Sequence, residues 1–233
     1  VGYAGPMIEE VEDSLCELAA EFNVWLIPGS IYQREGDKVF NTAPVISPTG
    51  KVIKRFQKIC PFLPFEKGVE AGSDICFFDV PEVGRFGLYI CYDMWFPELS
   101  RAMVAEGVEV ILHPTLTDTC DRDVEKAMAR ATAAQQQSYV VDINGTGALG
   151  VGQSMVVGPE GEVIHEALCG EEVILFEADL GRVRRSRERG ILGLGQPLKS
   201  FRDGILTNAE KYAPNQSPYL DSLGPLEVAK RER

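Results

Sequence analysis

The chain has 233 residues, and its 23 basic and 35 acidic side chains give a formal net charge of −12 at pH 7. Apolar residues make up 45% and charged residues 25%, which is typical of a globular protein. The acidic balance argues against nucleic-acid binding, which needs a basic face. No apolar run reaches the ~18 residues of a membrane span, and no signal peptide is in view. We therefore expect a cytoplasmic protein that binds neither nucleic acid nor membrane.

The sequence shows no recognisable metal-binding or dithiol redox motif. The six cysteines are scattered, with no C-x-x-C pair, and the two histidines are His113 and His165. Zinc ribbons and dithiol redox sites need closely spaced ligands of these types. The sequence therefore predicts no metal site and no cofactor.

The first part of the chain predicts a helix and an antiparallel meander. Apolar residues at helical spacing, with acidic residues opposite them, indicate a surface helix over 6–22. The segment 58–75 is long, irregular and rich in Pro and Gly, and such loops are usually functional. The strands expected between these two segments are 24–32, 39–46 and 51–56, with turns at 34–38 and 47–50.

The rest of the chain alternates strands and helices, which is typical of a sheet with helical crossovers. An arginine-rich run at 182–189 is expected to pair internally or between subunits, and the last forty or so residues are expected to form an extended arm. The expected strands are 76–80, 85–91, 108–113, 138–144, 154–158, 162–166 and 171–180, and the expected helices are 97–106 and 123–137.

Cys91 stands where an apolar strand meets a predicted helix. A thiol at such a turn is exposed beside converging backbone N–H groups, and the positive end of the helix favours its thiolate. Cys91 is therefore a candidate nucleophile; the alternative is a buried structural cysteine.

Four more residues have both a chemical and a structural interpretation. Lys58 precedes the apolar run I-C-P-F-L-P-F, which could desolvate its ammonium, and Glu66 ends that run, although a surface ion pair is the alternative. Trp95 is expected either to line an acyl pocket or to pack in the core. His113, at a strand end, is expected either to contact substrate or to be a satisfied structural histidine.

Together these segments resemble the nitrilase superfamily of carbon–nitrogen hydrolases. The resemblance runs from Val1 to about Leu194 and rests on K-I-C-P-F-L-P-F-E, G-L-Y-I-C-Y-D-M-W-F-P-E-L and the segments 129–145 and 152–164. It implies an α/β fold, an α-β-β-α four-layer sandwich formed by a domain at 1–195. A C-terminal extension would cover 196–233, and the chain would self-associate as a dimer or higher oligomer.

The same resemblance implies the roles of the site residues. Cys91 would be the nucleophile, Lys58 and the backbone N–H of Tyr92 would stabilise the oxyanion, and Glu66 would be an auxiliary acid. Trp95 and His113 remain candidate substrate contacts. The implied reaction is hydrolysis of a small amide through a cysteine thioester, which releases ammonia or an amine. The alternatives are an N-carbamoyl amide hydrolase, a nitrilase or a noncatalytic nitrilase-like binding protein.

One part of the family pattern has no match. The general-base glutamate of the family lies in an F-P-E block just before a segment like V-G-Y-A-G-P, and the sequence opens with that segment. Neither Glu9 nor Glu10, which lie beyond it, matches the base. We expect that the sequence lacks the family's N-terminal strand, helix and strand; a native pseudoenzyme is the alternative.

Overall fold

The computed structural model describes residues 7–204, so the first six residues and most of the predicted C-terminal extension lie outside the described part. The helices are α1 (Met7–Phe22), the short 3₁₀ helix η1 (Cys91–Trp95), α2 (Pro97–Ala105), α3 (Asp121–Gln136), α4 (Leu180–Arg189) and α5 (Pro197–Arg202). The strands are β1 (Ile31–Glu35), β2 (Lys38–Ile46), β3 (Val52–Gln57), β4 (Cys76–Val80), β5 (Gly84–Leu88), β6 (Val110–Thr115), β7 (Tyr139–Asn144), β8 (Met155–Val157) and β9 (Val163–Glu166).

The strands form two sheets. The antiparallel meander β1-β2-β3 is the smaller one, and β4 to β9 lie in chain order in a six-stranded sheet. At the centre of that sheet β5, β6 and β7 are parallel, while the outer pairs are antiparallel. Since parallel strands point the same way, the carboxyl ends of β5, β6 and β7 meet at one edge of the sheet.

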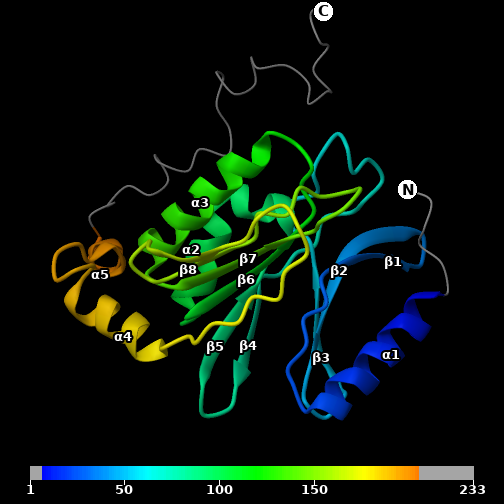
Figure 1. Ribbon diagram of the computed structural model, residues 1–233, viewed down its shortest axis with the longest axis horizontal. Coiled ribbons are helices and arrows are strands. Elements are labelled where there is room, and N and C mark those ends of the chain that lie inside the picture. The colour runs from blue at the N-terminus through cyan, green and yellow to red at the C-terminus, as the bar shows by residue number, and fades with distance from the viewer. Residues whose placement is uncertain (1–6, 205–233) are drawn as a thin grey trace, which may run out of the picture.

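The elements stack in layers (Figure 1). Helix α1 lies outside the small sheet, and α2 with α3 covers the far face of the large sheet. Val45 and Phe56 of the small sheet belong to the same buried cluster as Leu88 and Ile111 of the large sheet. That cluster also holds Ala133 of α3. The predicted α/β fold, an α-β-β-α sandwich, is confirmed.

Local sequence signals explain how two elements are placed. The turn before β3 contains Gly50 with a φ of +71°, and a Cβ there would lie 2.7 Å from the carbonyl oxygen of Cys16. Only glycine lets this turn approach the backbone of α1 so closely. Helix α2 begins with Pro97, whose missing N–H costs nothing at a first helical position.

Three sequence predictions are wrong in part. The predicted strand 24–32 is interrupted: Leu26 forms an isolated bridge to Ile46, and the next paired residues are Ile31 and Tyr32 at the start of β1, because Pro28 and Gly29 break the extended chain between them. Strand β5 ends at Leu88, three residues before the predicted end. The segment 171–179 is not a strand, since in the described chain no neighbouring strand pairs with it, and Leu175 is 90% exposed.

Helix α4 replaces the end of that predicted strand and contains the arginine run. Its N-cap, Asp179, accepts a hydrogen bond from the backbone N–H of Gly181. Arg184 pairs with Glu109 at 2.7 Å, and Arg185 pairs with Asp179 at 2.8 Å. Internal pairing of the run is therefore confirmed. Helix α5 lies in the segment predicted as an extended arm. None of the helices in residues 7–204 is long and apolar enough to cross a membrane.

Candidate active site

Cys91 occupies a sharp turn at the carboxyl end of β5. It is the first residue of η1 and has a φ of +49°, a left-handed conformation that residues with side chains rarely adopt. The first N–H groups of a helix have no partner within the helix, and the N–H of Tyr92 lies in this position. The turn thus combines a half-buried thiol with backbone donors beside it.

Asp93 holds this turn against the loop that follows β3. Its Oδ2 accepts from the N–H of Ile90 at 3.0 Å, and its Oδ1 accepts from the N–H of Cys60 at 2.7 Å. The side chain has no exposed surface. Burial raises the pKa of Asp93 to about 6, although both backbone N–H groups oppose the shift. One carboxylate therefore fixes the turn of Cys91 next to the loop of Lys58.

Lys58 and Glu66 form a buried ion pair. Lys58 follows β3 directly and is only 2% exposed, and its Nζ lies 2.6 Å from Oε2 of Glu66. That oxygen also accepts from the N–H of Phe62, while Oε1 accepts from Tyr32 and Asn41 at 3.0 Å each. Four donors therefore surround the Glu66 carboxylate, and the surface-pair alternative for these two residues is excluded.

The donors around Glu66 set its charge state. Burial raises the pKa of Glu66, but the hydrogen bonds from Lys58, Phe62 and Asn41 lower it more, and the resulting pKa lies below the ordinary value. Burial, together with the Glu66 carboxylate, raises the pKa of Tyr32 to about 12. At neutral pH the site therefore presents an ionised Glu66 and a protonated Tyr32 hydroxyl.

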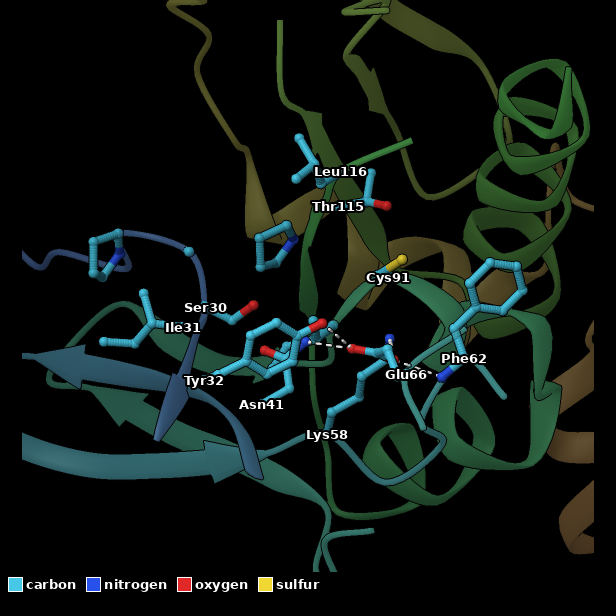
Figure 2. A pocket seen from close by; sticks show the side chains of 14 residues that line it. Ser30, Ile31, Tyr32, Asn41, Lys58, Phe62, Glu66, Cys91, Thr115 and Leu116 are labelled. Carbon is cyan, nitrogen blue, oxygen red and sulfur yellow. Dashed lines mark hydrogen bonds and ion pairs between the residues drawn. The ribbon is translucent and has the colours of Figure 1, made fainter. Parts of the chain in front are cut away.

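Cys91, Lys58 and Glu66 line one cavity of about 420 Å³ (Figure 2). In this view Cys91 lies between the Lys58–Glu66 pair and the residues Thr115 and Leu116 that end β6 and begin the next loop. The other walls are largely apolar. They include Pro28, Ile31, Phe62, Ile90 and Pro114. The cavity can thus hold a small molecule against a thiol and an ammonium.

A second, smaller cavity of about 80 Å³ also reaches Cys91. Trp95 and Tyr92 line it, with ring centroids 5.7 Å apart. Phe62, Cys91 and Leu116 border both cavities. Trp95 is therefore placed where a substrate group beyond the reacting carbon could reach it, and the contact itself stays a prediction.

His113 does not reach either cavity. It has no exposed surface, its Nδ1 lies 2.8 Å from Oδ1 of Asp142, and its Nε2 lies 2.9 Å from the carbonyl oxygen of Cys91. The substrate contact predicted for His113 is therefore wrong for this structure, because both ring nitrogens are already engaged behind the turn. The structural interpretation holds instead.

The sequence did not single out Tyr32, Asn41, Asp93 or Asp142. Tyr32 and Asn41 lie in predicted strands, where polar residues are ordinarily solvent-facing. Asp93 sits two residues after the candidate nucleophile, and this proximity was the one local signal that could have found it. Within residues 7–204, no three His, Cys, Asp or Glu side chains gather as metal ligands.

Comparison with known proteins identifies a family. A sequence model of the carbon-nitrogen hydrolase family matches residues 2–188. The omega-amidase NIT2 of Homo sapiens is 29% identical over 202 residues, which cover 80% of this chain and 73% of that protein. A hydrolase in the agr operon of Staphylococcus lugdunensis is 29% identical over 193 residues, which cover 78% and 80%.

Solved structures show the same fold. Nit3 of Saccharomyces cerevisiae, a member of branch 10 of the nitrilase superfamily, superposes with a TM-score of 0.71 at 29% identity. The match covers 76% of this chain and 68% of that one. A carbon-nitrogen hydrolase from Helicobacter pylori G27 superposes with a TM-score of 0.77 at 24% identity, over 91% and 78% of the two chains.

Proposed function

The chain belongs to the carbon–nitrogen hydrolase family, and from that premise we propose that it hydrolyses a small linear amide through a thioester on Cys91. The observation that carries the proposal is the placement of Cys91 and the buried Lys58–Glu66 pair on one cavity. A thiol nucleophile next to a fixed cation is the arrangement that acyl transfer requires.

The reaction has two halves. The sulfur of Cys91 attacks the amide carbon, and the carbonyl oxygen becomes an oxyanion that accepts from the Lys58 ammonium and the Tyr92 N–H. Collapse of this intermediate breaks the C–N bond, and the nitrogen leaves protonated as ammonia or an amine. Water then hydrolyses the thioester, which releases a carboxylic acid and restores the thiol of Cys91.

Glu66 acts in this scheme by positioning Lys58 rather than by accepting the thiol proton. Both of its oxygens already accept two hydrogen bonds each, and its pKa lies below the ordinary value. A general base needs a free lone pair and a pKa near the working pH. We therefore assign deprotonation of Cys91 to a group other than Glu66.

The omega-amidase relatives support an unsubstituted ω-amide as the first substrate to test. N-carbamoyl compounds and nitriles are the chemical alternatives, since the thiol of Cys91 can attack the carbamoyl carbon or the nitrile carbon as it attacks an amide carbon. A binding protein without turnover is the alternative of another class.

Ammonia release from a panel of short aliphatic amides, ω-amides of dicarboxylic acids, N-carbamoyl amino acids and nitriles distinguishes these alternatives. We expect turnover of amides and a covalent acyl adduct on Cys91 in rapidly quenched samples, visible by mass spectrometry. Binding of amides without ammonia release from any compound would contradict the proposal and favour the binding protein.

Assembly and location stay predictions from the sequence. The proposed small-molecule substrate would bind in the cavity of a single chain. Self-association as a dimer or higher oligomer is a separate proposal. Sedimentation velocity tests it: a single species at the mass of one chain would contradict self-association. The cytoplasmic location is tested by fractionation.

A further inference from the structure

Behind the Cys91 turn lies a buried group of four ionisable side chains. His113 on β6, Asp142 on β7, and Arg122 and Glu125 in the first turns of α3 are each at most 3% exposed. Such side chains are rarely buried unless they are paired. None of the four has a role in the proposed reaction, so this group calls for a separate explanation.

The four side chains are linked in order. His113 Nδ1 lies 2.8 Å from Asp142 Oδ1, and Arg122 Nη2 lies 2.6 Å from Asp142 Oδ2. Arg122 Nη1 also reaches Glu125 Oε2 at 3.2 Å. Burial raises the pKa of Asp142, but its bonds to His113 and Arg122 lower it more, and the carboxylate is held ionised.

The chain of contacts ends on the backbone of Cys91. Nε2 of His113 lies 2.9 Å from the carbonyl oxygen of Cys91, and a carbonyl oxygen can only accept. Nε2 of His113 is therefore the donor in this hydrogen bond.

Cys91 is the residue whose conformation this bond restrains. Its φ of +49° lies in the left-handed region, where a residue with a side chain persists only if its surroundings hold it. Asp93 holds the turn from the side of the Lys58 loop, and His113 holds the carbonyl from the side of β6. The direction of the thiol follows from that conformation.

We propose that His113, oriented by the buried Asp142–Arg122 pair, is a positioning residue that aims the Cys91 thiol into the cavity. The inference rests on the proposed role of Cys91 as nucleophile. At the other end of this group, Glu125 accepts a hydrogen bond from the hydroxyl of Thr117 at 3.0 Å. Thr117 lies in the loop that borders the second cavity. The same group of side chains therefore also fixes the loop that faces the thiol.

The test uses His113→Phe, which keeps a ring but removes both hydrogen bonds, and His113→Gln, whose amide can still donate to the Cys91 carbonyl. His165→Phe is the matched control, since His165 is the other histidine of the chain and is partly exposed on β9. Two readouts are used: kcat and KM for an amide, and the rate at which iodoacetamide alkylates Cys91. In alkylation the sulfur displaces iodide, so this readout needs no substrate; peptide mass spectrometry separates Cys91 from the five other free cysteines.

For His113→Phe we expect kcat to fall at least about tenfold with little change in KM, the usual result of misplacing a reacting group. Alkylation of Cys91 should slow in parallel, His113→Gln should recover part of both losses, and His165→Phe should match the wild type. Circular dichroism and thermal melting establish that each variant is folded. If His113→Phe does not fold, His113→Leu, which also lacks both hydrogen bonds, takes its place in the comparison.

Wild-type kcat and alkylation in a folded variant that lacks both hydrogen bonds would overturn the inference. A loss in His113→Phe that His113→Gln does not recover at all would overturn the hydrogen-bond role as well. Activity in Cys91→Ala would instead refute the proposed function itself, so the two failures are distinguishable.

Discussion

Cys60 and Asp93 are joined by a 2.7 Å hydrogen bond from backbone N–H to carboxylate, and this bond ties the loop of the cation to the turn of the thiol. Because Asp93 also accepts from the N–H of Ile90, a displacement of either segment would be transmitted to the other. The relative positions of Lys58 and Cys91 thus depend on one buried side chain as well as on the sheet.

Replacing Cys91 with Ala should abolish amide hydrolysis and leave the fold intact. The side chain is only half-buried at a turn, so its loss removes the nucleophile without opening a core cavity. Ammonia release and circular dichroism are the measurements. Cys120→Ala, at an exposed free cysteine, is the control and should keep full activity. Turnover within tenfold of wild type in folded Cys91→Ala would rule out the nucleophile.

Lys58→Ala should lower kcat by at least about 10²-fold, the usual effect of losing one oxyanion donor. Lys51→Ala, at an exposed lysine of the preceding turn, serves as the control. Steady-state kinetics on the best amide of the panel are the measurement. If only KM rises, Lys58 binds the substrate and the transition state equally well, and this result would contradict the oxyanion role.

Glu66→Gln should reduce both kcat and stability. Both oxygens of Glu66 accept hydrogen bonds, whereas the amide nitrogen of Gln would face the same donors and could not accept from them. Lys58 would also be left buried without its counter-charge. We expect a loss of about 2 kcal/mol or more in the free energy of unfolding. Urea unfolding measures it, with Glu70→Gln, at an exposed residue of the same segment, as control. Wild-type stability in Glu66→Gln would contradict the four-donor geometry.

Asp93 should make stability depend on pH between about 4 and 6. Its pKa in the folded chain is about 6, above the ordinary 3.8, chiefly because it is buried. The folded state therefore binds more protons in this window, and its contribution to stability is greatest below about pH 4 and declines as the pH rises to 6. We expect a decline on the order of 1–3 kcal/mol.

The test compares urea unfolding of wild type and Asp93→Asn at pH 4, 5, 6 and 7. The stability difference between the two proteins should change across the window and be constant above it. Asp37→Asn, at an exposed turn residue, should show no such change. A difference that is the same at every pH would show that Asp93 keeps an ordinary pKa in the folded chain.

The principal site residues were predictable because their signals are local. Cys91 ends an apolar strand, and Lys58 and Glu66 flank an apolar run, so neighbours in the sequence already indicate a turn and a cation and carboxylate that could pair. That this pair is buried rather than at the surface was decided by the fold. The resemblance of these segments to one family then assigned roles. By contrast, Asp142 and Arg122 lie 20 residues apart and meet only because β7 and α3 pack together. Charged residues on a helix are ordinarily solvated, and nothing local distinguishes Arg122 from the rest.

The sequence by itself determined the alternation of strands and helices and the candidates for thiol, cation and carboxylate, since hydrophobic periodicity and turn residues act within a few positions. Tertiary structure decided the rest. In the described chain no neighbouring strand pairs with the segment 171–179, so this segment does not form a strand. The packing also places His113 behind the Cys91 turn rather than in the cavity. Which groups face a cavity and which are buried together depends on how the sheets and helices pack, and this packing joins residues that are distant in the chain.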